Sequence, residues 1–337
     1  MLPLKFPRFF ARPAAVSATL LTLGALTGCP ETKNGKLLDT PTSGNVQVTV
    51  DETLRPIIAA HIDSFQGLYP DAKVRATYAP ESDAIARFMA SDSVRAVVSA
   101  RRLTPEEEAE LLRQQIIPVQ TRIAIDGVAV ILHPSNPDSL LSVAQVAELC
   151  RGKVTQWAQL NAENQLGGAT VVFDNSASST RRYVRDSVLQ GQPVANTAFA
   201  TKTNEELIEY VARHPGAVGF IGVNWISDHD DAAVRGFLKK VRVAALTTKR
   251  GGATSADFVK PYQANVALWR IRRAPYYPLC RELYIVSREG RAGLGTGFAS
   301  FVAGDQGQRI FLKAGLVPAT VPVRLVQTAD DRPAPTQ

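Results

Sequence analysis

The chain has 337 residues, of which 45% are hydrophobic, and it carries a formal net charge of +7. This length fits two domains or one large domain. Lys5, Arg8 and Arg12 supply three of the positive charges, so the rest of the chain carries about +4 (7 − 3), too little and too scattered to indicate nucleic-acid binding. The four histidines are isolated and no Cys/His spacing fits zinc, so we expect no metal and no other cofactor.

The first 28 residues have the pattern of a secretion signal. The basic residues precede an apolar stretch, residues 14–26, which is short for a membrane-spanning helix. The sequence Leu26-Thr27-Gly28-Cys29 then resembles the lipobox of bacterial lipoproteins, in which the cysteine is acylated and becomes the mature N-terminus. The alternative is a chance Gly-Cys pair after a soluble helix. We expect removal of residues 1–28 and a lipid on Cys29 that holds the protein at the membrane of the cell envelope.

Polar segments flank the remainder of the chain. Residues 29–45 are expected to form a flexible tether, and residues 326–337 a disordered tail. Between them the first strand and helix patterns alternate: strands at 46–50, 73–78 and 94–99, and helices at 54–68, at 82–89 and from 104. This order predicts a parallel sheet, with ligand-binding turns at the carboxyl ends of its strands, at residues 51–54, 80–83 and 99–103.

A second set of α/β patterns follows. Residues 116–120 and 123–132 are expected strands, and Asp126-Gly127 is expected to interrupt the second of them. Later expected elements are a helix at 142–150, a strand from 171, a helix at 204–213, strands at 217–223, 263–268 and 282–286, and helices at 298–303 and 306–314. The glycine-rich residues 293–297 lack the lysine of a phosphate-binding loop and are expected to lead into a helix.

Residues 171–184, VVFDNSASSTRRYV, are the most informative segment. They are expected to form a short strand, a hydroxyl-rich turn and the start of a helix. A helix N-terminus presents unpaired N–H groups and a partial positive charge. Hydroxyls and arginines beside such an end favour an anion site. The alternative is a serine-rich cap on a surface helix.

In this order the segments resemble the PstS-like phosphate-type substrate-binding proteins of ABC transporters, over about residues 46–318. The resemblance is carried by VDETLRPIIAAHIDSFQGLYPDAKV, VVSARRLTPEE, IAIDGVAVILHPSNP, GKVTQW with NSASST, GAVGFIGVNW, YPLCRELYIV and GQRIFLKAGLVP. It implies an α/β class II periplasmic-binding fold with two lobes, each a mixed, mostly parallel sheet flanked by helices. Lobe 1 would comprise residues 46–126 and 264–325, and lobe 2 residues 127–263, joined by crossover strands and closing at a hinge.

The resemblance places an oxyanion in the cleft between the lobes. The residues it implies are the Thr53 hydroxyl, the Leu54 N–H, Ser82 and a charge-neutralising Arg101 on one side, and Ser178, Ser179, Thr180 and Arg181 on the other. The alternative for Thr53, Ser82 and Ser178 is that each simply caps a helix.

Three positions depart from the family pattern. Ser179 stands where glycine is usual, and Asp174 stands where an arginine is common. Ala100 replaces an aspartate that, in phosphate binders, accepts the proton of hydrogen phosphate. Because unpaired buried groups set specificity, these departures leave the identity of the oxyanion open.

The resemblance implies a lipid-anchored, monomeric solute-binding protein that captures phosphate or a related oxyanion and delivers it to an inner-membrane ABC permease. No G-x-x-x-x-G-K-[ST] motif occurs, so the ATPase would be a separate chain. The alternative is an envelope module that senses oxyanions or acts as a scaffold without transport. An enzyme is not expected, because Ser176 and Ser178 lack a G-x-S-x-G nucleophile elbow. Cys150 and Cys280 are expected to be small buried or half-buried side chains, with pairing in an oxidising compartment left open.

Overall fold

A computed structural model of the chain describes residues 32–33, 36–37, 39–228, 230, 232–271 and 275–320. The expected signal peptide, Cys29 and the expected tail lie outside the described residues. The chain divides into two units, Met1–Leu38 and Asp39–Gln337. In the first unit, β1 (Thr32–Lys33) pairs antiparallel with β2 (Lys36–Leu37). The second unit contains all the elements described below.

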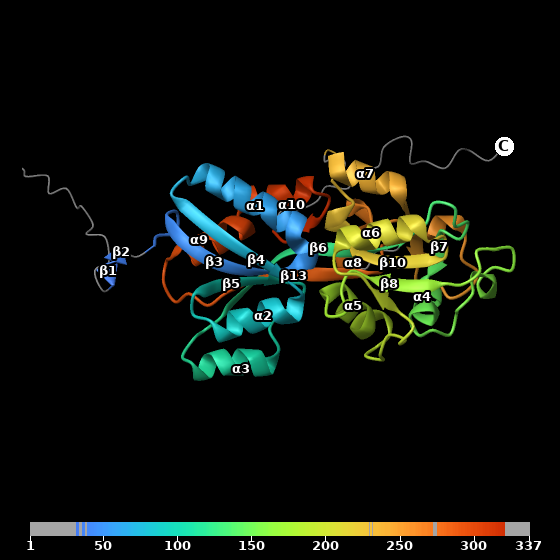
Figure 1. The fold of residues 1–337 in the computed structure, drawn as a ribbon. Coiled ribbons are helices and arrows are strands. Elements are labelled where there is room, and N and C mark those ends of the chain that lie inside the picture. Colours follow the sequence, from blue (N-terminus) through green and yellow to red (C-terminus); the bar gives the residue numbers. More distant parts are fainter. Residues whose placement is uncertain are drawn as a thin grey trace, which may run out of the picture. The chain divides into compact units, whose positions relative to one another are not determined.

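A mixed sheet of ten strands runs through the second unit (Figure 1). Its main path follows the order β4 (Ala72–Ala79), β3 (Gly44–Asp51), β5 (Val94–Ser99), β13 (Cys280–Ser287), β6 (Val119–Leu132), β10 (Ala217–Gly222), β8 (Thr170–Phe173) and β9 (Phe199–Ala200). Two short strands, β11 (Arg242–Val243) and β14 (Val317–Pro318), also pair with β6. A separate parallel pair is formed by β7 (Leu140–Ser142) and β12 (Ala245–Thr247).

The expected parallel set is present at one end of this sheet. Strand β3 pairs parallel with both β4 and β5, so the carboxyl ends of all three strands lie at one edge. Strands β8 and β10 form a second parallel pair, and β13 runs antiparallel to both β5 and β6. The turns that follow β3, β4 and β5 therefore lie close together.

Strand β6 contributes residues to three hydrophobic cores, to the third of them through Ala129 and Ile131. It has 14 residues, and the last ten are all buried. Ile123 and Ala124 belong to a core around β3 and β5, whereas Ile125 and Val128 belong to a core around β8 and β10. The expected break at Asp126-Gly127 is wrong, because Arg281 on the paired strand β13 compensates the aspartate charge in register. Of the expected strand at 116–120, only residues 119–120 belong to a strand, and they begin β6.

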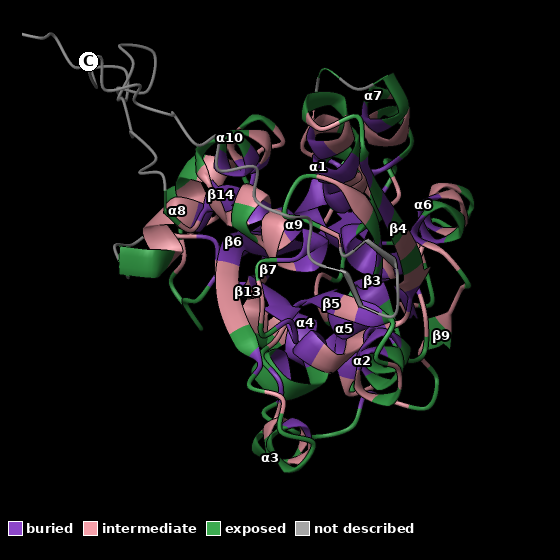
Figure 2. Cartoon of the chain, turned by 90° about the vertical axis from the view of Figure 1, so that its left-hand side faces the viewer, coloured by how far each residue is buried: buried purple, intermediate pink, exposed green. Residues whose placement is uncertain are grey.

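Helices cover both faces of the sheet. They are α1 (Arg55–Leu68), α2 (Glu81–Ala90), α3 (Pro105–Arg113), α4 (Val143–Cys150), α5 (Ser179–Tyr183), α6 (Asn204–Arg213), α7 (Ala232–Lys240), α8 (Gln263–Ile271), α9 (Leu294–Ala303) and α10 (Asp305–Lys313). Figure 2 shows buried residues concentrated on the central strands, and exposed residues on the outer sides of helices such as α3, α6 and α7. Capping boxes at Thr104 and Ser142 begin α3 and α4. No helix in the described part of the chain has the length and apolar character needed to span a membrane.

One predicted strand is a helix. The sequence analysis predicts a strand at residues 263–268, but they form the first part of α8. Val266 and Trp269, three residues apart, pack on the same core, which is the spacing of a helix face. The Gln263 side chain donates to the carbonyl groups of Leu312 and Leu316, so it ties the start of α8 to the end of α10.

Candidate functional site at the strand ends

The turn after β3 places a buried threonine at the carboxyl edge of the sheet. Asp51, the last residue of β3, accepts hydrogen bonds from the Thr53 N–H at 3.0 Å and from the Thr53 hydroxyl at 2.9 Å, and so caps the turn η1 (Glu52–Leu54). From the neighbouring turn η4 (Val223–Trp225), the side chains of Asn224 and Trp225 donate to the Thr53 carbonyl at 3.0 and 2.8 Å. Thr53 is therefore held through both its backbone and its side chain.

The helix start after β8 places buried hydroxyls against this turn. Ser178 is the N-cap of α5, and its Oγ accepts from the Arg181 N–H at 3.2 Å. Ser179 and Thr180 are fully buried, and the Ser179 Oγ lies 3.0 Å from the Thr53 Oγ1. The Thr180 hydroxyl has no hydrogen-bond partner among the described residues. The segment is thus both a cap, at Ser178, and one wall of a buried polar cluster, at Ser179.

The cation of this cluster is Arg281, on β13. Its side chain is 2% exposed, and it donates from Nη1 to the Ser179 Oγ at 2.8 Å and from Nη2 to the Thr53 Oγ1 at 3.2 Å. Its Nε and Nη2 also donate to the Asp126 Oδ2, at 3.1 and 2.9 Å. A single guanidinium therefore joins the turn after β3, the start of α5 and the crossing strand β6.

The directions of the hydrogen bonds follow from these partners. The Thr53 hydroxyl gives its proton to Asp51, and its oxygen accepts from Arg281. The bond between Thr53 and Ser179 must then be donated by Ser179. Both hydroxyls are satisfied by protein groups in this structure, so a ligand that uses them would replace the bond that they share.

Three buried carboxyl groups surround this one cation. Burial and, secondarily, the charge of Glu81 raise the pKa of Asp51 from 3.8 to about 6. Burial raises the pKa of Asp174 to about 7, and the negative charge of Asp51 contributes to this rise. Burial also raises the pKa of Asp126, against the attraction of Arg281. Since one guanidinium cannot balance three carboxylates, these groups retain protons at pH values where exposed aspartates are ionised.

A carboxylate lies close to Ala100 although that residue cannot supply one. Glu81, at the start of α2, is buried, and its Oε1 accepts the Ala100 N–H at 3.0 Å. Arg182 from α5 donates to both oxygens of Glu81, one of them at 3.1 Å, and to the Ala100 carbonyl at 3.2 Å. A buried carboxylate therefore lies beside the backbone of Ala100, and Arg182 of α5 pairs with it.

The remaining predicted residues lie outside the buried cluster. Arg101 makes two hydrogen bonds with Glu107, at 2.7 and 2.8 Å, and lies 3.8 Å from Glu81. Ser82 is exposed, and Arg181 donates to the Ser176 carbonyl at 2.8 Å. All three border a pocket of about 400 Å³ that also reaches Ser178, Arg182 and Arg185. The Leu54 side chain is buried in the core beyond the turn.

Sequence reasoning missed Arg281, the residue that connects the cluster. It lies in the segment YPLCRELYIV, which carries part of the family resemblance, but the expected strand in this segment begins only at residue 282. The available signal was a charged residue within a strand that is otherwise buried, because arginine is almost never fully buried without a partner. Asp126, within the apolar strand expected at residues 123–132, gives the same signal.

Cys150 and Cys280 are both buried, as expected, and they do not form a disulfide. Burial raises the pKa of the Cys150 thiol to about 12, and the Cys280 thiol donates to the Tyr277 carbonyl. No cluster of potential metal ligands occurs among the described residues.

The fold and this cluster define a class of protein. A mixed α/β sheet runs from the core around β3 and β5 to the cores around β8 and β10, and a buried polar cluster lies at the turns that follow β3 and β8. The family model for the PBP superfamily domain matches residues 38–306, and the chain belongs to this superfamily. The predicted two-lobed periplasmic-binding fold and the resemblance to PstS-like proteins are confirmed.

Curated relatives are similar along most of their length. The Protein SphX of Synechococcus elongatus is 23% identical over 294 residues, which cover 85% of this chain and 80% of that protein. The phosphate-binding protein PstS of Pseudomonas aeruginosa is 22% identical over 306 residues, with 85% and 86% covered.

Solved structures show the same fold. A putative phosphate ABC transporter substrate-binding protein from Clostridium perfringens, with bound phosphate, has a TM-score of 0.67 at 21% identity, and the match covers 82% of this chain and all of that one. An ABC-type phosphate transport receptor from Vibrio cholerae has a TM-score of 0.60 at 19% identity, with 82% and 100% covered.

Proposed function

We propose that this protein is a solute-binding protein that captures phosphate or a related oxyanion between its two lobes and delivers it to an ABC permease. The observation that carries the proposal is the buried guanidinium of Arg281, which donates to the hydroxyls of Thr53 and Ser179 at 3.2 and 2.8 Å. Arginine and hydroxyl donors that converge in a buried place are suited to an anion with several acceptor oxygens.

An oxyanion would take the place of the hydrogen bond between Thr53 and Ser179. Ser179 would then turn its proton toward the ligand, and Thr53 could do so by giving up its bond to Asp51, while Arg281 supplies the positive charge. The Thr180 hydroxyl, which is buried and without a partner among the described residues, is a further donor beside Ser179. The N–H groups around Leu54 and at the start of α5 add partial positive charge.

Ligand entry would require the lobes to separate, because the residues of the cluster are buried. We propose the lobe boundaries expected from the sequence: residues 46–126 and 264–325 in lobe 1, and residues 127–263 in lobe 2. The crossing strands β6 and β13 then carry the hinge, as in other two-lobed binding proteins. Several contacts would separate on opening, among them those of Thr53 with Ser179, Asn224 and Trp225, that of Ser179 with Arg281, and that of Glu81 with Arg182.

The acidic groups would make binding depend on the protonation of ligand and protein. When ionised, Asp51 and Asp174 can accept a proton from hydrogen phosphate, which sulfate does not carry at neutral pH. When protonated, each can donate a hydrogen bond to any oxyanion. Glu81 provides a further carboxylate near the position of the missing aspartate.

The relatives and the sequence supply the cellular part of the proposal. The curated relatives include phosphate-binding proteins, and the similar structures include receptors of ABC-type phosphate transport. The N-terminal sequence supports export, with Cys29 carrying a lipid anchor and the tether allowing the monomer to reach the permease. The protein binds and releases its ligand rather than converting it chemically.

Calorimetric titration of the purified protein with phosphate, arsenate, sulfate and molybdate, at pH 6 and pH 8, tests the proposal. We expect one ligand per chain for at least phosphate. Failure to bind any of the four anions at either pH would reject the oxyanion function.

A further inference from the structure

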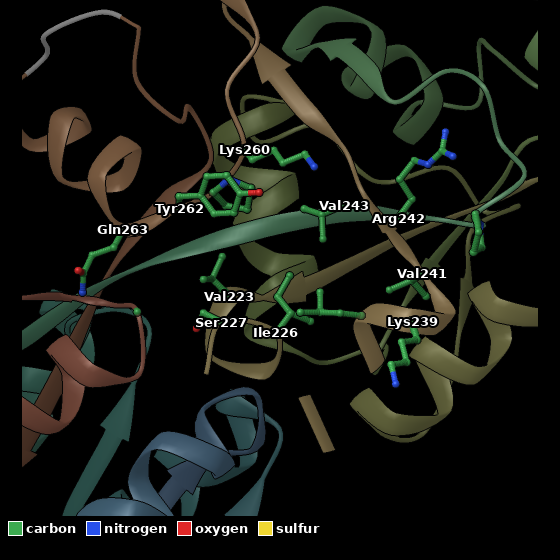
Figure 3. Close-up of a pocket in the computed structure, with 14 residues that line it drawn as sticks. Val223, Ile226, Ser227, Lys239, Val241, Arg242, Val243, Lys260, Tyr262 and Gln263 are labelled. Carbon is green, nitrogen blue, oxygen red and sulfur yellow. The ribbon is translucent and has the colours of Figure 1, made fainter. Parts of the chain in front are cut away.

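A second pocket lies away from the buried cluster. It has a volume of about 530 Å³ and lies among η4, the end of α7, β11 and the start of α8 (Figure 3). None of the predicted oxyanion residues lines it. The lining residues are Pro134, Val223, Ile226, Ser227, Leu238, Lys239, Val241, Arg242, Val243, Lys260, Pro261, Tyr262, Gln263 and Gly315.

The centre of this pocket is apolar. Val223, Ile226 and Val241 are buried, and Val243 is half-buried; these side chains occupy the middle of the view in Figure 3. Ligand pockets of about 300–1,000 Å³ with a mainly apolar lining and a few polar groups are typical of sites for small organic molecules. The volume and the lining therefore fit a compact organic body.

Three cations surround this apolar centre. Lys239, Arg242 and Lys260 all line the pocket and are exposed, and none of them forms an ion pair within the part of the chain that the structure describes. Arg242 uses one guanidinium nitrogen to donate to the Asn136 carbonyl at 2.8 Å, which leaves its charge uncompensated. In Figure 3 Lys260 lies on one side of the valines, and Arg242 and Lys239 on the other. Positive charges around a concave apolar surface attract an anion.

An exposed aromatic ring completes the rim. Tyr262 is 58% exposed and lies beside Lys260 (Figure 3). An aromatic side chain with a polar tip beside a cation suits a ligand that has both a flat apolar body and a negative group.

We propose that this pocket binds a small organic anion with an apolar, preferably aromatic, body, such as an aromatic carboxylate. The body packs on Val223, Ile226 and Val243, and the carboxylate pairs with Lys260 or Arg242. An inorganic oxyanion makes no use of the apolar centre, and a neutral apolar molecule makes no use of the three cations.

The probe is 2-naphthoate, and its neutral counterpart is 2-naphthalenemethanol. Calorimetry on the full chain should give a dissociation constant below about 1 mM for naphthoate, corresponding to about −4 kcal/mol, and binding at least tenfold weaker for the alcohol. Lys260→Gln and Tyr262→Ala should each weaken naphthoate binding at least fivefold. Lys202→Gln removes an exposed lysine outside this pocket and should leave the affinity for naphthoate unchanged.

Phosphate titration of the Lys260→Gln and Tyr262→Ala variants provides the measure of intact folding, because neither residue belongs to the buried cluster. Unaltered phosphate affinity with weakened naphthoate binding would support a separate site. The proposal is overturned if naphthoate does not bind, if the alcohol binds equally well, or if both pocket variants bind naphthoate like the unmodified protein.

Discussion

Replacement of Asp174 by asparagine should change how stability depends on pH. Asp174 is buried, and burial raises the pKa of its carboxyl from 3.8 to about 7. The folded protein therefore keeps this proton up to about pH 7, whereas the unfolded chain releases it near pH 4. The stability that the bound proton provides is complete below pH 4, and it is lost as the pH rises to about 7. Asparagine has a similar shape and no charge at any pH, so Asp174→Asn removes this dependence.

The size of the effect follows from the two pKa values. Between 3.8 and about 7 the difference corresponds to about 4 kcal/mol, of which about 2.5 kcal/mol is lost between pH 5 and pH 8. Between pH 5 and pH 8, the free energy of unfolding of Asp174→Asn should therefore rise by about 2.5 kcal/mol relative to that of the unmodified protein. This rise corresponds to roughly 5 to 10 °C in Tm. Above pH 8 the difference in stability between the two proteins should remain constant, because Asp174 is then ionised in both the folded and the unfolded chain.

Denaturant unfolding of both proteins at pH 5, 6, 7 and 8, in buffers free of phosphate and sulfate, measures this difference. Asp71→Asn, at an exposed aspartate, is the control and should show no such trend. A difference in stability between Asp174→Asn and the unmodified protein that is independent of pH would show that the pKa of Asp174 is not raised, as would a larger stability loss in the variant at pH 8 than at pH 5.

Three further predictions concern ligand binding and the turn after β3. Ser179→Ala and Thr53→Val should each weaken phosphate binding by about 1–3 kcal/mol, measured by calorimetry, and unchanged affinity in both would remove these hydroxyls from the site. Trp225→Phe removes a donor to the Thr53 carbonyl and should cost about 1 kcal/mol in denaturant unfolding; no loss would show that this bond contributes nothing. Sulfate has a constant charge, so its affinity should fall at least tenfold between pH 5 and pH 8 as Asp51 and Asp174 ionise, and a flat calorimetric profile would contradict their place beside the anion.

Much of the fold could be predicted from the sequence, because the local patterns agree with the tertiary environment. Strand β3 and helix α1 follow the expected periods, since each buries one face against the same core. The residues 263–268 were misread because Val266 and Leu268 fit a two-residue alternation over a short span. Only the packing of Val266 with Trp269 shows that the period is helical.

The buried cluster was only half predicted, for a related reason. Thr53 and Ser179 follow strands and begin helical turns, so local sequence indicates their place at the sheet edge. Arg281 is brought to them by the pairing of β13 with β6, and no local pattern specifies that register. Arg101 follows β5 as the family pattern suggests, but its guanidinium pairs with Glu107 of the capping box that begins α3.

We propose that Arg281, and not Arg101, is the cation that holds the oxyanion. Phosphate titration of Arg281→Gln and Arg101→Gln beside the unmodified protein tests it most directly. A double variant, Asp126→Asn with Arg281→Gln, avoids an unpaired buried carboxylate and keeps the test valid if the single variant is unstable.

We predict that both variants of Arg281 lose at least about 100-fold in phosphate affinity, or about 3 kcal/mol, whereas Arg101→Gln stays within about threefold. Phosphate binding that survives in the folded Arg281 variants and is lost in Arg101→Gln would show that Arg101, and not Arg281, holds the oxyanion.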